Sequence, residues 1–201
     1  MEPFTSVTGA TAPLDRANVD TDQIMPKEFL KRIERTGFGE FIFHNWRQEE
    51  DDFVLERPEF RDAPILVAGP NFGSGSSREH APQGLRRWGI RAIVGESFAE
   101  IFFGNSLMIG LACVTAAPSD IEALMALVDR EPGTPIVVDI AAGVCHAGTL
   151  RFPVSAPPAV RDALMSGAWD TTGLLMDRYD EVNAAAARLP YLSGSSSPRS
   201  N

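Results

Sequence analysis

The sequence predicts an α/β fold, with a mostly parallel sheet covered by helices and an added antiparallel patch. Between residues 64 and 128, short apolar runs alternate with helical patterns, an order typical of parallel strands joined by covering helices. Between residues 136 and 154, three β-type runs follow one another, separated by Gly143 and Gly148, which indicates antiparallel strands. A length of 201 residues with 44% hydrophobic content suits one soluble domain with a packed core.

The N-terminal third contains few regular patterns. The first 25 residues are rich in turn-forming and acidic residues, and residues 27–35 alternate basic and apolar side chains at helical spacing until Gly37 and Gly39. An aromatic cluster then predicts core or interface positions. Its members are Phe38, Phe41, Phe43 and Trp46.

The middle third is more regular. Residues 64–68 form an apolar run that predicts a buried strand, residues 71–75 a Gly/Ser loop, and residues 76–88 a helix ended by Gly89. A second buried strand is expected at residues 90–94 and a third within 107–115. The pattern Ser-x-x-Glu predicts capping boxes that start the helices at 97–103 and 119–128. The capping pairs are Ser97 with Glu100 and Ser119 with Glu122.

The C-terminal third adds the antiparallel runs and two helices. The runs are residues 136–140, 144–146 and 149–154, and the helices are expected at 157–166 and 179–188. The last residues are of low complexity and predict a disordered tail. We therefore expect one domain at residues 1–190 and a tail at 191–201.

Composition and charge restrict the class of ligand. Acidic residues outnumber basic ones by 27 to 18, a net charge of −9, which argues against non-specific binding to nucleic acid or acidic membranes. No apolar run approaches the roughly 20 residues that cross a bilayer, and the N-terminus lacks a signal-peptide pattern, so a cytoplasmic location is expected.

The two cysteines, Cys113 and Cys145, predict reduced thiols in a packed interior. They lie far apart in sequence and lack the C-x-x-C spacing of a metal site. An iron–sulfur cluster needs about three or four thiolates, so this chain alone is not expected to hold one. No cofactor-binding or metal-binding residue is predicted.

The Gly/Ser loop and its flanks, residues 71–80, carry the candidate chemistry. Ligands of open parallel sheets bind beyond the carboxyl ends of strands, and glycines let the backbone approach a ligand closely. Arg78 can hold a carboxylate in two hydrogen bonds, and the environment expected for a helix start favours ionisation of a serine hydroxyl. These features predict a carboxylate site with a reactive serine at its edge. In a purely structural interpretation, Ser76 and Glu79 only form a capping box.

Other glycine-rich motifs fit poorly. A phosphate-binding P-loop ends in Gly-Lys-Ser/Thr, and this loop has no lysine. A dinucleotide fingerprint places a third glycine where Arg78 stands. The hydrolase motif G-x-S-x-G is absent.

Residues 73–80 (Gly-Ser-Gly-Ser-Ser-Arg-Glu-His), with 69–72 before them, resemble the signature of the aconitase family's swivelling domain. Residues 18–26 (Asn-Val-Asp-Thr-Asp-Gln-Ile-Met-Pro) are similar to that family's second motif. Spacing and length resemble those of bacterial isopropylmalate isomerase small subunits, and the resemblance covers about residues 4–188. Segments 29–32, 97–102 and 173–175 also agree.

The resemblance implies a swivelling β/β/α domain and a hydro-lyase of leucine biosynthesis. The implied reaction converts 2-isopropylmalate to 3-isopropylmalate through 2-isopropylmaleate. Ser76 would be the catalytic base, and substrate-binding roles would fall to Ser77, Arg78, Asp22, Lys31 and Arg32, with either Lys31 or Arg32 supplying a second carboxylate contact. A specificity loop at 27–37 would sense the alkyl group through Phe29, Leu30 and Ile33.

The resemblance also implies a partner, because the family places a [4Fe-4S] cluster in a separate large subunit. The expected ligands are that subunit and a small dicarboxylate substrate. The chain departs from the family pattern at Ser74, at Gln83 and at residues 108–110, which keeps a methylmalate or maleate hydro-lyase open. Two hypotheses from different functional classes are a non-catalytic anion-binding module and a serine hydrolase.

Overall fold

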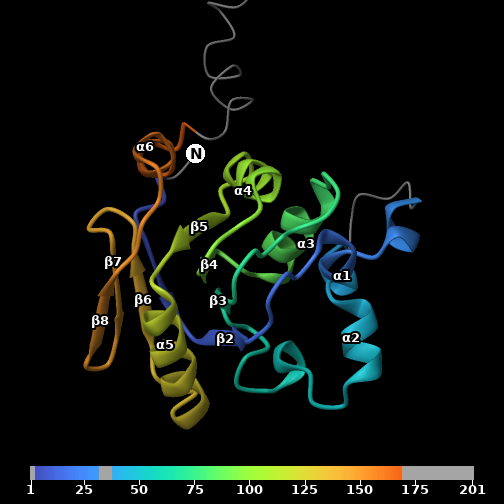
Figure 1. Ribbon diagram of the computed structural model, residues 1–201, viewed down its shortest axis with the longest axis horizontal. Coiled ribbons are helices and arrows are strands. Elements are labelled where there is room, and N and C mark those ends of the chain that lie inside the picture. Colours follow the sequence, from blue (N-terminus) through green and yellow to red (C-terminus); the bar gives the residue numbers. More distant parts are fainter. Residues whose placement is uncertain (1–2, 32–37, 169–201) are drawn as a thin grey trace, which may run out of the picture.

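The computed structural model describes residues 3–31 and 38–168, and a four-stranded parallel sheet lies at its centre (Figure 1). Its strands are β2 (Thr11–Leu14), β3 (Ile65–Ala68), β4 (Ala92–Gly95) and β5 (Ala112–Thr115), in the order β2-β3-β4-β5. Each neighbouring pair is parallel, which confirms the predicted α/β class.

A second sheet is wholly antiparallel and confirms the predicted patch. It consists of β1 (Ser6–Gly9), β6 (Ile136–Asp139), β7 (Val144–Ala147) and β8 (Leu150–Pro153), in the order β1-β6-β7-β8. Strands β1 and β2 were not predicted, because their segment reads as turns. Strand β2 contains Pro13, which has no N–H group to donate, and it lies at the edge of its sheet, where a proline is tolerated.

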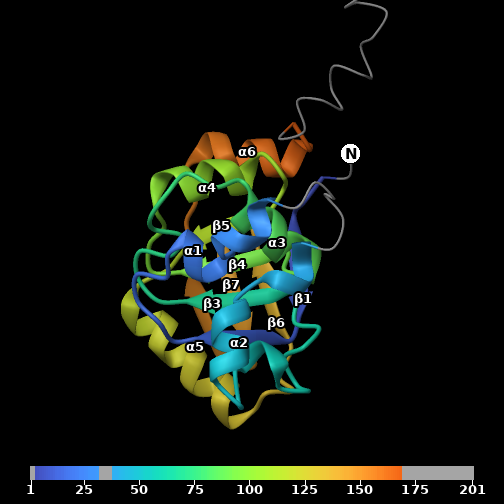
Figure 2. The ribbon, with the colours of Figure 1, turned by 90° about the vertical axis from the view of Figure 1, so that its right-hand side faces the viewer.

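Six α-helices complete the described part of the chain. They are α1 (Thr21–Ile24), α2 (His44–Glu49), α3 (His80–Trp88), α4 (Glu100–Leu107), α5 (Pro118–Arg130) and α6 (Pro158–Ser166). Short 3-10 helices lie at Lys27–Lys31, Phe38–Phe41 and Val54–Glu56. The antiparallel sheet lies on one side of the parallel sheet, and α1, α2 and α3 lie on the other (Figures 1 and 2). This is the β/β/α layering that the resemblance implied.

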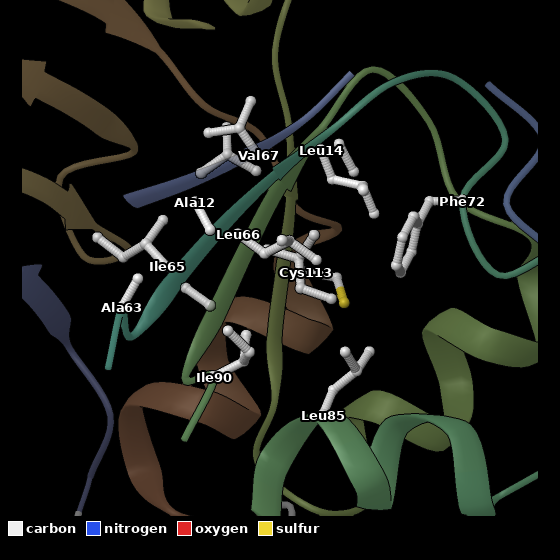
Figure 3. Packing of buried hydrophobic residues seen from close by; sticks show 14 of the residues in the cluster. Ala12, Leu14, Ala63, Ile65, Leu66, Val67, Phe72, Leu85, Ile90 and Cys113 are labelled. Carbon is white, nitrogen blue, oxygen red and sulfur yellow. The ribbon is translucent and has the colours of Figure 1, made fainter. Parts of the chain in front are cut away.

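The core lies on both faces of the parallel sheet. All four residues of β3 and of β4 are buried, as their continuous apolar runs predicted. Leu85 of α3, Cys113 of β5 and Phe72 converge on the same cluster in Figure 3. Burial of each large apolar side chain stabilises the fold by roughly 1.5–3 kcal/mol. Packing in this cluster therefore stabilises the parallel sheet whose strands lead into the loops described below.

The helix starts differ from the predicted capping boxes. The N-cap residues of α3, α4 and α5 are Glu79, Ala99 and Ala117, and none makes a side-chain cap hydrogen bond. The three predictions of a Ser-x-x-Glu box were therefore wrong. The described capping box belongs to α1, where Asp20 and Gln23 exchange side-chain and backbone hydrogen bonds. The predicted end of α3 at Gly89 is confirmed.

Several predictions fall partly or wholly outside the described residues. The predicted helix at 27–35 is a 3-10 helix over Lys27–Lys31, and its remainder lies outside. Arg32, Ile33, the helix at 179–188 and the tail at 191–201 also lie outside. Among the helices that the structure describes, none is long and apolar enough to cross a membrane.

Candidate active site at the carboxyl edge of the parallel sheet

Two loops meet where neighbouring parallel strands end. Residues 15–20 lead from β2 into α1, and residues 69–79, which we call the serine loop, lead from β3 into α3. Asp20 and Ser74 form a parallel β-bridge, and the Thr21 N–H donates to the Ser74 carbonyl at 2.8 Å. The pairing of the two strands thus continues into their loops. The two motifs noted in the sequence therefore form one unit.

The serine loop has a constrained backbone. Asn71, Gly73 and Gly75 have positive φ angles of 57°, 80° and 94°, a region that favours glycine and tolerates asparagine. At Gly73 a Cβ atom would lie 2.1 Å from Cγ of Phe102, so α4 packs directly against the loop. The rings of Phe72 and Phe102 also meet edge to face, with centroids 5.3 Å apart. The serine loop therefore packs against α4 through Phe72 and Gly73.

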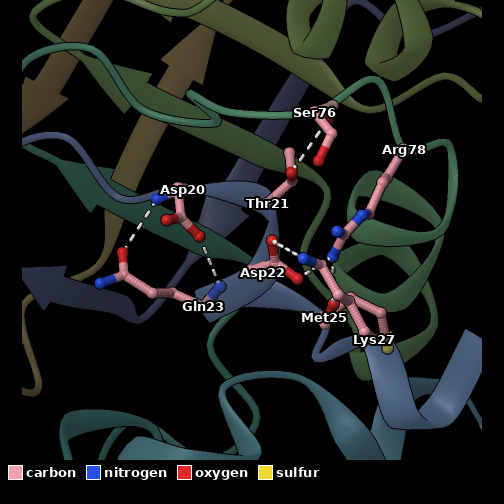
Figure 4. A network of polar contacts seen from close by, with 8 residues as sticks. All are labelled: Asp20, Thr21, Asp22, Gln23, Met25, Lys27, Ser76 and Arg78. Carbon is pink, nitrogen blue, oxygen red and sulfur yellow. Dashed lines mark hydrogen bonds and ion pairs between the residues drawn. The ribbon is translucent and has the colours of Figure 1, made fainter.

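An ion pair joins the serine loop to α1. The Arg78 guanidinium donates through Nη1 to the Asp22 carboxylate and to the Met25 carbonyl, the latter at 3.3 Å (Figure 4). Lys27 Nζ lies 3.7 Å from the other Asp22 oxygen. The Arg78 side chain is only 9% exposed and that of Asp22 is 39% exposed. Two cations thus share one carboxylate, and the cluster keeps a positive formal charge.

The two serines lie at the open side of this cluster. Ser76 and Ser77 are exposed, and the Ser76 carbonyl accepts a hydrogen bond of 2.9 Å from Thr21 Oγ1. Arg78 lies two residues before the first residue of α3, so the prediction that it stands in the first turn of a helix was wrong. The loop backbone is instead held by its pairing with residues 18–21. The arrangement can bind an anion at Arg78 and present a hydroxyl beside it.

The structure brings together four of the predicted site residues, namely Ser76, Ser77, Arg78 and Asp22. Phe29 of the predicted specificity loop stacks on Phe41, with ring centroids 4.3 Å apart, and its role there stays a prediction. Leu30 and Lys31 belong to the 3-10 helix, but their side chains are outside the described structure, as are Arg32 and Ile33.

Sequence reasoning missed Thr21, and it placed Lys27 only in a helix. The signal that could have found Thr21 is the pattern Asp-x-x-Gln at Asp20 and Gln23, because it starts a helix and puts Thr21 and Asp22 in its first turn.

The two cysteines do not fit an iron–sulfur cluster. Cys113 lies on β5 and Cys145 on β7, in different sheets, and both are buried. Burial raises the pKa of each thiol to about 12, and for Cys113 a hydrogen bond with Ser106 offsets part of that effect. A cluster is held by thiolates, which these thiols do not form near neutral pH. In the described ranges, no group of three or more His, Cys, Asp or Glu side chains gathers in a way that could hold a metal ion.

Comparison with known proteins independently supports the resemblance to the aconitase family. Residues 1–118 match the family model described as the aconitase C-terminal domain. The chain is 47% identical over 192 residues to the 3-isopropylmalate dehydratase small subunit of Acidothermus cellulolyticus, covering 94% of this chain and 95% of the relative. It is 42% identical over 201 residues to the small subunit of the same name from Corynebacterium glutamicum, covering all of both chains.

A more distant relative carries the same name, and a solved structure has a similar fold. The small subunit of that name from Thermus thermophilus is 39% identical over 195 residues, covering 95% of this chain and 97% of the relative. A crystal structure described as 3-isopropylmalate dehydratase from Methanocaldococcus jannaschii superposes with a TM-score of 0.66 over 90% of this chain and 99% of that chain. Its sequence identity is 23%, so this likeness supports the fold alone.

Proposed function

The chain belongs to the family of 3-isopropylmalate dehydratase small subunits. From this premise we propose that it is the small subunit of a hydro-lyase that interconverts 2-isopropylmalate and 3-isopropylmalate in leucine biosynthesis. The observation that carries the proposal is the pairing of Arg78 with Asp22 beside the exposed Ser76. Arg78 and Ser76 lie two residues apart in the serine loop, at the carboxyl edge of the sheet, where an acid substrate would be bound.

Arg78 is suited to bind a substrate carboxylate. Among the described residues, only its Nη1 atom has protein hydrogen-bond partners, Asp22 and Met25, which leaves Nη2 and Nε for two further hydrogen bonds. Guanidinium and carboxylate groups match in such bidentate pairs. Asp22 holds the guanidinium in place from the protein side, and Ser77 would bind the same substrate carboxylate.

Ser76 is the proposed base. Its ionised Oγ would take a proton from C3 of 2-isopropylmalate, the C–H electron pair would form the C2=C3 double bond, and hydroxide would leave C2. In the second half, hydroxide would add to C3 of 2-isopropylmaleate while the Ser76 hydroxyl returned the proton to C2. One water leaves and one returns, so the reaction is an isomerisation. The positive charge of Arg78 and Lys27 favours the ionised serine.

The exposure of Ser76 and Ser77 indicates that a partner covers the site, and we propose that this partner is the large subunit, in a heterodimer. We also propose that a [4Fe-4S] cluster belongs to that subunit, because the buried thiols here do not suit it. When bound, the cluster would supply a Lewis acid for the departing hydroxyl. Two free cysteines suit a reducing compartment, so we assign the pair to the cytoplasm.

Anaerobic co-expression with the cognate large subunit tests the function. We expect the purified pair to form 2-isopropylmaleate from 2-isopropylmalate, measured by ultraviolet absorbance, and either subunit alone to form none. Faster turnover of 2-methylmalate or maleate would instead identify a related hydro-lyase. Turnover by the small subunit alone would contradict the proposal.

Arg78→Lys is expected to lower kcat/KM of the pair by about tenfold to a hundredfold, mainly through KM, because lysine keeps the charge but cannot form the bidentate contact. Steady-state kinetics with 2-isopropylmalate measure the effect. Arg57→Lys is the matched control, since Arg57 pairs with the exposed Asp52 at 2.8 Å and surface pairs contribute little. Equal kinetics for both variants would exclude Arg78 from substrate binding.

A further inference from the structure

Thr21 contacts the serine loop on both sides of Gly75. Its N–H group donates to the Ser74 carbonyl at 2.8 Å, and its Oγ1 donates to the Ser76 carbonyl at 2.9 Å. Thr21 is 2% exposed, so its side chain is buried beneath the serine loop, whereas Ser76, which accepts its hydrogen bond, is exposed. Thr21 therefore holds the backbone of the proposed base from a position 55 residues away.

The serine loop needs such an anchor. Gly75 has a φ of 94°, Ser76 and Ser77 are exposed, and regular helix begins only at His80. A Cβ at Gly75 would lie 3.5 Å from Thr21 Oγ1, so the loop runs directly over this side chain. Without the anchor, the Ser76 backbone could rotate while the rest of the fold stayed intact.

Helix α1 holds the base and the anion-binding group through consecutive residues. Thr21 contacts Ser76, and Asp22 contacts Arg78 (Figure 4). The capping box of Asp20 and Gln23 fixes the start of this one-turn helix. The spacing between the serine and the guanidinium is thus set by one rigid turn of the chain.

We propose that Thr21 is a positioning residue, whose hydroxyl sets the orientation of Ser76 toward the substrate carbon. The inference rests on the proposed function and goes beyond it, because Thr21 acts through Ser76 and has no role in binding substrate. Misplacement of a catalytic group by about 1 Å can cost about a hundredfold in rate. The expected signature is a loss in kcat with little change in KM.

Thr11 provides a matched control. It is 1% exposed, and its hydroxyl has no hydrogen-bond partner among the residues that the structure describes. Thr11→Val therefore removes a buried hydroxyl without breaking a hydrogen bond, whereas Thr21→Val makes the same chemical change and breaks one. Thr21→Ser keeps the hydroxyl and removes only a methyl group.

The experiment uses the anaerobically assembled pair, with equal iron content and equal pair formation verified for each variant. We expect Thr21→Val to lower kcat by about tenfold to a hundredfold with KM changed less than about threefold. Thr21→Ser should recover most of the rate, and Thr11→Val should match the wild type. Thr21→Val should not lower the residual rate of Ser76→Ala further, because its effect passes through the serine.

Several results would overturn the inference. A wild-type kcat in Thr21→Val would do so, and so would equal losses of kcat in Thr21→Ser and Thr21→Val. If Thr21→Val fails to assemble, Thr21→Ser and Thr21→Ala still test the role of the hydroxyl by the same comparison. A wild-type pair without activity would instead overturn the proposed function itself, and this inference with it.

Discussion

Ser76→Ala is expected to lower kcat of the assembled pair by roughly 10²–10⁴-fold, because a positioned base contributes about that much to a proton transfer. Ser76 is exposed and alanine suits an exposed loop position, so the variant should fold and bind the large subunit normally. Initial rates of 2-isopropylmaleate formation, normalised to iron content, measure the effect.

Ser74→Ala serves as the control in the same loop. The Ser74 hydroxyl donates to the Asn18 carbonyl at 3.3 Å, a long hydrogen bond that holds the loop and faces no substrate in the proposed mechanism. We expect its rate to stay within about threefold of the wild type, as for the loss of one weak hydrogen bond. Full activity in Ser76→Ala would mean that this loop only binds anions and that the proton is moved by another group.

Gly73→Ala is expected to destabilise the chain by about 2–5 kcal/mol. The change forces a left-handed φ on a residue with a Cβ, and it places that atom 2.1 Å from the Phe102 ring, which cannot move without leaving the core. Urea unfolding followed by circular dichroism measures the loss as a lower midpoint.

Gly104→Ala is the matched control, because Gly104 lies on the exposed side of α4, the helix that packs against the serine loop. A Cβ at Gly104 meets no atom within 4 Å, and an alanine in a helix interior stabilises it by about 0.5–1 kcal/mol relative to glycine. If Gly73→Ala unfolds at the wild-type midpoint, α4 does not press against the serine loop as described.

Part of the fold could be predicted because its strands are self-evident in sequence. Strands β3 and β4 are continuous apolar runs, since both their faces are covered. Strands β1 and β2 escaped prediction because neither is a continuous apolar run and β2 carries Pro13. Their pairing partners, β6 and β3, lie 50 residues or more away in sequence, and that contact is not visible in a local pattern.

The sequence predicted which residues form the site, but it did not predict how these residues contact one another. The capping box expected at Ser76 is local, and tertiary pairing of the serine loop with residues 18–21 prevails over it. The contact of Asp22 with Arg78 joins positions 56 apart, so only the folded chain shows that one holds the other. Thr21 was missed because the Asp-x-x-Gln pattern shows only that a helix starts there, whereas its hydrogen-bond acceptor, the Ser76 carbonyl, lies 55 residues away.

The continuation of strand pairing from β2 and β3 into their loops also limits how this protein can be recombined with its relatives. A chimaera that carries the serine loop from one parent and residues 18–25 from another would have to match backbone donors and acceptors, glycine angles and an ion pair all at once. A working chimaera must therefore take both segments from the same parent. By contrast, Phe29 lies after this pair of segments and stacks on Phe41, so its side chain can be changed without altering the paired loops.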